Sequence, residues 1–302
     1  MAVNVLMDAK YAIRTGEFME AVHLLQTEDM QNPKVLSLLA EAFFYMGRFE
    51  EAYKTYHKLF HDSNVKTELM DGPVEEYDKE GQTIYQSLIN LGIPTIMERL
   101  PLTMDFDYKQ SKETPKESYD ELLEFQVFLE RCAGIAGKDM KKTAAIINDE
   151  LEVMMNNKNK VIVARAWMYR AELSFRQKDY MEAYRCYLKA ALTEVNKALY
   201  FGYAANMLMK CQEQDKNFVG IATVLTYRAI ELDYTNAKWH YNQGLNLMSL
   251  AKLFTSTGLG HLSFLKAAKK EFSIAYQACR EDQKQLKEQI EKMYTDVKKI
   301  IK

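Results

Sequence analysis

The sequence predicts an all-α fold, a solenoid of antiparallel helix pairs that ends in a capping helix. Apolar residues recur at spacings of three and four in pairs of neighbouring stretches, as expected of amphipathic helices. The paired pattern returns along the chain, which is typical of stacked helical repeats. The 302 residues include only 12 Gly and 5 Pro, few enough for a chain that is mostly helix.

The clearest pair covers residues 163–192. In its first half, Trp167, Ala171 and Ser174 share one helical face, and polar residues 177–179 then interrupt the pattern. The pattern resumes at spacings of three and four with Tyr180, Ala183, Tyr187 and Ala190. One hairpin of this size cannot bury its apolar face, so the pattern predicts neighbours built in the same way.

The N-terminal residues 1–64 contain two such pairs. Gly16 and Gly47 lie 31 residues apart, and the same spacing separates Phe18 from Phe49 and Ala21 from Ala52. A glycine that is followed by an aromatic residue two positions later, and by alanine three further on, marks the same turn twice. We therefore predict two repeats over 1–64.

Residues 65–160 depart from this plan. Residues 101–113 have neither helical nor strand periodicity and are predicted to form an irregular loop. Thr114 and Pro115 then fit a helix N-cap followed by proline at the first helical position. The segment is interpreted either as degenerate repeats or as an inserted helical subdomain. We favour degenerate repeats because helix pairs of similar length continue through it.

Residues 161–280 are predicted to hold three further repeats, and 281–302 a C-terminal capping helix. The second of these repeats has a longer turn near 212–218, and the third has an insertion at 255–260. In the capping helix one face is apolar and the opposite face is charged, which suits the exposed end of a solenoid. The apolar positions are Leu286, Ile290, Met293, Val297 and Ile300.

These motifs resemble the tetratricopeptide repeat (TPR), whose helix pairs recur every ~34 residues. Lys178 stands where the family usually has glycine, and residues 229–236 are similar to the family's repeat ending. The matching positions are Ala9, Gly16, Phe18, Ala21 and Pro33, then Ala40, Phe43, Gly47, Phe49, Ala52 and Tyr56, and then Trp167, Ala171, Tyr180, Ala183, Tyr187 and Ala190. The resemblance implies a right-handed superhelix and a non-catalytic protein that binds other proteins.

In such a superhelix the first helix of each pair lines the concave surface. The resemblance therefore implies a partner-binding set of mixed charge that includes several aromatic residues, suited to a peptide or a partner helix. The set is Lys10, Arg14, Glu41, Tyr45, Met168, Tyr169, Glu172, Arg176, Lys238, Tyr241 and Asn242. Some family members grip a C-terminal carboxylate with Lys and Asn. Here the matching asparagines are missing, apart from an isolated Lys238 and Asn242.

The bulk composition limits the partners. Lys plus Arg total 40 and Asp plus Glu total 42, a formal charge of −2 that argues against nucleic acid as a dedicated partner. Asp8 and Lys10 interrupt the N-terminal apolar stretch, so it is not a secretory signal. No apolar run is long enough for membrane insertion. Four cysteines without a CxxC pair are expected to be buried free thiols, which predicts a reducing, cytoplasmic compartment. They are Cys132, Cys186, Cys211 and Cys279.

No motif in the sequence predicts catalysis or a cofactor. His57 and His61 lie four apart on a helix, but we interpret them as solvated or capping residues, since metal sites usually need a third ligand. Asp105 and Asp107 fall in the irregular loop, and no phosphate-binding loop or nucleophile elbow is present. We expect no enzyme activity, no metal and no cofactor.

The predicted function is that of a protein–protein adaptor or scaffold, which includes a place in a multi-protein complex. Two alternatives stay open: a receptor that changes shape on binding a peptide, and an RNA-associated helical repeat. The lysines near the C-terminus are interspersed with acidic residues and are interpreted mainly as a solvated face. These lysines are Lys266, Lys269, Lys270, Lys284, Lys287, Lys298, Lys299 and Lys302.

Overall fold

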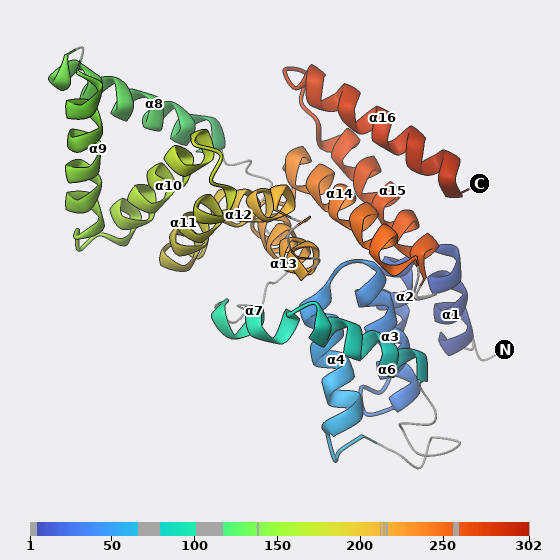
Figure 1. Cartoon of the computed structure of the whole chain (residues 1–302). Coiled ribbons are helices and arrows are strands. Elements are labelled where there is room, and N and C mark those ends of the chain that lie inside the picture. The colour runs from blue at the N-terminus through green and yellow to red at the C-terminus, as the bar shows by residue number, and fades with distance from the viewer. Residues whose placement is uncertain are drawn as a thin grey trace. The chain divides into compact units, whose positions relative to one another are not determined.

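The structure is a computed structural model that describes residues 5–65, 79–100, 117–137, 139–211, 217–255 and 260–301, with Glu213 and Asp215. The described residues form fifteen helices and no strand, which confirms the predicted all-α fold (Figure 1). The predicted loop 101–113 and the predicted helix start at Thr114 and Pro115 lie outside them. The handedness of a superhelix stays a prediction.

The chain divides into two compact units. Unit 1 comprises residues 1–100, 212–227 and 236–302, and unit 2 comprises 101–211 and 228–235. The helices of unit 1 are α1 (Val5–Thr15), α2 (Phe18–Leu25), α3 (Pro33–Tyr45), α4 (Phe49–His61), α6 (Lys79–Asn90), α7 (Ile93–Arg99), α14 (Ala237–Phe254), α15 (His261–Ala278) and α16 (Lys284–Ile301). Those of unit 2 are α8 (Glu117–Ala136), α9 (Met140–Met155), α10 (Lys160–Arg176), α11 (Tyr180–Thr193) and α12 (Ala198–Lys210). α13 (Asn217–Leu232) contributes residues to both.

The described part of segment 65–160 is divided between the units. α6 and α7 pack against α4 in unit 1, whereas α8 and α9 pack against each other, and α9 against α10, in unit 2. The repeat boundaries taken from the sequence stay predictions.

Three inter-helix turns share one hydrogen-bond pattern. At the first two, the amides of Gly16 and Gly47 donate to the carbonyls of Ile13 and Phe44, and the following residue donates one position further back. At the third turn, the Lys178 amide donates to the Phe175 carbonyl in the same way. This pattern requires a left-handed residue, and φ is +88° at Gly16, +75° at Gly47 and +64° at Lys178. The structure thus places Lys178 at the position of the turn glycines.

Replacing Lys178 by Gly is therefore expected to raise the free energy of unfolding of unit 2 by about 0.5–1 kcal/mol. A left-handed conformation costs an L-residue about 1–2 kcal/mol, and the greater freedom of glycine in the unfolded chain offsets part of the gain. The measurement is urea unfolding followed by fluorescence in a Trp239→Phe background, where Trp167 alone reports. Gln177, with φ of −81°, is the matched control, since Gln177→Gly should lower stability. Equal effects of the two substitutions would contradict the strain at Lys178.

The core of unit 1 joins the first helix pairs to the last one. The ring of Phe44 on α3 lies 5.8 Å from Phe254 on α14 and 5.2 Å from Phe264 on α15. Tyr45 lies 5.5 Å from Phe264, between ring centres. Figure 1 shows the blue N-terminal helices beside orange α14 and α15. In a linear solenoid each repeat contacts only its neighbours, so the sequence did not predict this contact.

A second contact in unit 1 involves the turn between α1 and α2. The Nζ of Lys266 on α15 donates to the carbonyl of Arg14 at 2.6 Å, and the aliphatic part of Lys266 packs over Gly16. Lys270 forms an ion pair with Glu17 at 3.7 Å. A cation at the C-terminus of α1 offsets the negative end of the helix dipole, which favours this arrangement.

A helix, α16, lies in the predicted C-terminal segment 281–302, and its role as the cap of a solenoid stays a prediction. α16 packs against α15 and buries Ile290 and Val297, while its lysines and acidic residues remain outside. Leu286 and Met293 are half-buried and Ile300 is exposed.

The four cysteine side chains are free thiols that take part in packing within the chain. Cys132, Cys186 and Cys211 are buried and free, and Cys279 is half-buried and free.

Among the described helices, none combines the length and the apolar character that a membrane span requires.

Candidate functional site

The N-terminal members of the predicted binding set differ in exposure. Lys10 and Arg14 are exposed on α1, and Glu41 is half-buried on α3. Tyr45 is only 3% exposed, because Phe264 and Phe44 pack against its ring. Its hydroxyl donates to Glu80 Oε1 at 3.5 Å, and burial, with Glu41 and Glu80 nearby, raises the pKa of Tyr45. Tyr45 is therefore a core residue and is removed from the candidate surface.

Two members on α10 are also in the core. Met168 and Tyr169 are 1% and 4% exposed. The ring of Tyr169 lies 5.1 Å from Phe125 and 4.9 Å from Phe128, both on α8. Helix α8 covers the Tyr169 ring, and both side chains are too buried to reach a partner.

The next two members on α10 have distinct surroundings. Glu172 accepts a hydrogen bond from the hydroxyl of buried Tyr187 on α11. Burial raises the pKa of Tyr187, and the negative charge of Glu172 raises it further. Arg176 is exposed, with its guanidinium 5.0 Å above the ring of Phe125. Glu172 thus satisfies an internal hydroxyl, whereas Arg176 presents its charge at the surface.

The members on α14 are half-buried. The Nζ of Lys238 lies 5.7 Å above the Trp239 ring, and the ring of Tyr241 packs against Phe272. Burial raises the pKa of Tyr241. The Nδ2 atom of Asn242 is buried and has no hydrogen-bond partner among the described residues. These side chains contribute packing as well as polar surface.

Sequence reasoning missed a group that we call the Lys210 cluster, made of Phe175, Tyr180 and Lys210. The Nζ of Lys210, at the end of α12, lies 5.9 Å from the Phe175 ring and 5.4 Å from the Tyr180 ring. The two rings are 6.1 Å apart, and Phe175 is 37% exposed. The sequence offered one signal of this cluster, the aromatic residues Phe175 and Tyr180 on either side of the predicted turn at Lys178.

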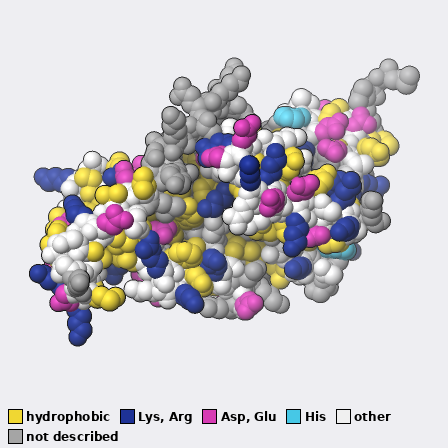
Figure 2. Space-filling model, turned by 90° about the horizontal axis from the view of Figure 1, so that it is seen from above, with side chains coloured by type: hydrophobic (Ala, Val, Ile, Leu, Met, Phe, Trp, Pro, Cys, Tyr) yellow, Lys and Arg dark blue, Asp and Glu magenta, His cyan; other side chains and the backbone are white. Residues whose placement is uncertain are grey.

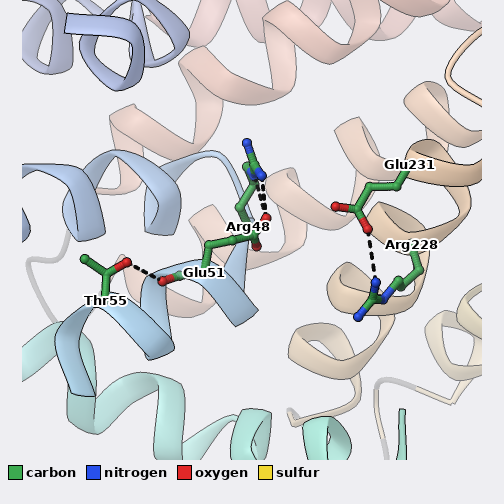
Figure 3. A network of polar contacts seen from close by, with 5 residues as sticks. All are labelled: Arg48, Glu51, Thr55, Arg228 and Glu231. Atoms are coloured by element: carbon green, nitrogen blue, oxygen red, sulfur yellow. Dashed lines mark hydrogen bonds and ion pairs between the residues drawn. The ribbon is translucent and has the colours of Figure 1, made fainter. Parts of the chain in front are cut away.

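Two arginine–glutamate pairs lie at helix ends, one at the start of α4 and one near the end of α13 (Figure 3). In unit 1, Arg48 Nε donates to Glu51 at 2.9 Å, and Thr55 donates to the Glu51 carbonyl at 2.7 Å. In unit 2, Arg228 pairs with Glu231 at 3.4 Å. Each pair joins residues three apart on one helix, so each supports its own helix.

Within the part of the chain that the structure describes, no group of three or more His, Cys, Asp or Glu side chains is arranged to hold a metal ion.

Comparison with known proteins gives structural likenesses only. No family model matches the sequence, and no curated protein matches it significantly. Among solved structures, the TPR2AB domain of yeast Sti1 in its pHSP90 complex is similar with a TM-score of 0.34 and 16% identity, covering 97% of each chain. Yeast Tom70 is similar with a TM-score of 0.35 and 14% identity, covering 96% of this chain and 60% of the Tom70 chain.

Proposed function

We propose that this protein is a non-catalytic TPR-like adaptor that binds a peptide or helical segment of a partner protein. The observation that carries the proposal is the exposed surface at the ends of α10 and α12, where Arg176 and the Lys210 cluster lie. Arginine and exposed aromatic rings are the residue types that most often anchor a protein partner. The four free cysteines suit the reducing cytoplasmic compartment that the proposal assumes.

The chemistry of this surface suggests an acidic segment with apolar side chains. Arg176, Lys178 and Lys210 are exposed cations, and the rings of Phe175 and Tyr180 lie beside them. A carboxylate would pair with the cations while an apolar side chain packs against a ring. In unit 1, exposed Lys10 and Arg14 with half-buried Lys238, Tyr241, Asn242 and Glu41 stay a second proposed contact set.

The distribution of charge favours a protein partner over RNA. On the face drawn in Figure 2, dark blue and magenta side chains are interspersed, and yellow side chains lie among them. An RNA-binding repeat would present a continuous basic surface, because phosphate contacts supply most of its affinity.

Affinity purification of the full chain from extract of its native cell, at low and at moderate salt, tests the proposal. The variant Arg176→Glu with Lys210→Glu should lose a stoichiometric protein partner that wild type retains. The matched control is Arg185→Glu on α11, whose side chain is 64% exposed and pairs only locally with Glu182 at 3.5 Å. It should keep the partner.

A partner that survives Arg176→Glu with Lys210→Glu would move the binding surface elsewhere. Loss of the partner in the Arg185→Glu control as well would show that the effect is not specific to this surface. Recovery of nucleic acid that washes off with salt would replace the adaptor proposal with the RNA alternative.

A further inference from the structure

Two histidines on α4 form an exposed pair on successive helical turns. His57 and His61 are both exposed, and their ring centres lie 4.7 Å apart with 50° between the ring planes. Among the described residues, neither imidazole takes part in a hydrogen bond or an ion pair. Their ring nitrogens are therefore accessible to a ligand from solvent. Imidazole nitrogen is the commonest protein ligand for transition metals.

An aromatic wall lies beside the pair. The Tyr53 ring is 5.9 Å from His57, and the Tyr85 ring on α6 is 6.0 Å from His61. Tyr53 and Tyr85 stack on each other at 5.3 Å, and Phe60 packs against Tyr85 at 5.6 Å. Rings held in this way limit the rotamers open to both histidines, so less side-chain entropy is lost when a ligand joins them.

The spacing of the rings matches a shared metal ion. With a metal–nitrogen bond of about 2.1 Å and about 1.1 Å from nitrogen to ring centre, two imidazoles at 90° on one ion have centres about 4.5 Å apart. A tetrahedral angle would place the centres about 5.2 Å apart by the same geometry. The observed 4.7 Å lies closer to the first value, that of adjacent positions on a square-planar or octahedral ion.

Contrary to the expectation from the sequence, we propose that His57 and His61 together bind one late transition-metal ion, Cu²⁺ or Ni²⁺, at the surface of α4 without a third protein ligand. These ions favour nitrogen donors and tetragonal geometry, and Cu²⁺ stands highest in the affinity order of divalent metals. Water occupies the positions that the protein leaves open, or a donor from a partner does. Mg²⁺ and Ca²⁺ do not compete, because they require oxygen ligands.

The test is isothermal titration of the full chain, prepared without a polyhistidine tag, with Ni²⁺ and with Cu²⁺. One ion per chain is expected to bind, and the paramagnetic resonance spectrum of the Cu²⁺ form should show two nitrogen ligands. Loss of an outer-shell partner of a metal ligand already weakens binding by roughly 10- to 100-fold, so His57→Ala and His61→Ala, which each remove a ligand, should weaken it by at least about 10-fold. Exposed single histidines supply the controls, His23→Ala and His261→Ala, which should bind as wild type does.

The double variant His57→Ala with His61→Ala sets the background from the amino terminus and other surface groups. Binding by wild type that is no tighter than this background would overturn the proposal. An equal loss in His23→Ala would overturn it too, as would a spectrum with one nitrogen ligand. Unfolding curves of the variants should match wild type, since both side chains are exposed.

Discussion

Replacing Phe44 by Ala is expected to lower the free energy of unfolding of unit 1 by about 3–5 kcal/mol. Phe44 is fully buried, and its ring lies within 6 Å of Phe49, Phe254 and Phe264. Its loss would leave a cavity where α3 meets α14 and α15, and surrounding side chains could fill only part of it. Fewer favourable contacts would then stabilise the packing of the N-terminal helix pairs against α14 and α15.

The measurement is urea unfolding followed by tryptophan fluorescence. The sequence has two tryptophans, and Trp239 is buried in unit 1 while Trp167 belongs to unit 2. In a Trp167→Phe background the signal therefore reports on unit 1 alone. Tyr11→Ala is the control, because Tyr11 is an aromatic residue of unit 1 that is 71% exposed. A Phe44→Ala variant as stable as Tyr11→Ala would show that the aromatic core contributes little.

Gly47→Ala should destabilise unit 1 by about 2–4 kcal/mol. Alanine would adopt a left-handed φ of +75°, which costs about 1–2 kcal/mol, and the lower freedom of alanine in the unfolded chain offsets part of that cost. Its Cβ would also lie 2.9 Å from Gln243 Nε2, 2.9 Å from Thr223 Cγ2 and 3.1 Å from Leu247 Cδ2. Crowding of this kind in a packed core costs about 1–3 kcal/mol.

Gly137 separates the two contributions. Its φ is +70°, yet a Cβ added there would meet nothing within 4 Å. Gly137→Ala should therefore show the net conformational cost alone, about 0.5–1 kcal/mol, because the lower freedom of alanine in the unfolded chain offsets part of the strain. Urea midpoints of both variants give the comparison. Equal losses at the two glycines would mean that the close approach of α14 to the turn at Gly47 is not present in solution.

Much of the local structure was predictable from the sequence. The spacing of Gly16 and Gly47 predicted both turns. The family resemblance placed Lys178 at the glycine position of a third turn, and its positive φ confirms that placement. Such features depend on a few neighbouring residues, and a repeated pattern shows them more than once.

The sequence did not predict which helices cover each apolar face. Helical periodicity shows that α3 has an apolar face at Phe44 but not that Phe254 and Phe264, far along the chain, cover it. For the same reason Tyr45 was expected on a concave surface, although α15 buries it. Tyr169 was expected there too, and the helix that covers it comes from a segment whose arrangement the sequence left open.

These differences explain why the candidate site was only partly predictable. Arg176 was predicted and is exposed, because it ends α10 and only the face of its guanidinium contacts a ring, that of Phe125. Phe175 and Lys210 were not linked beforehand, since they lie on different helices and no short-range pattern connects them. The N-terminal helix pairs pack against α15, and this packing buries Tyr45. Most of the exposed cations and aromatic rings that we propose for binding therefore belong to unit 2.

The choice of candidate binding surface depends on the shared core of unit 1. Hydrogen–deuterium exchange of a Phe264→Ala variant, compared with wild type, tests it most directly, because Phe264 is buried against Phe44, Tyr45 and Phe254. Amide protection is expected to fall in α3 and α4 together with α14 and α15, while α10 and α11 keep theirs. Unchanged protection in α3 and α4 would contradict a common core and return the N-terminal face to the candidate surface.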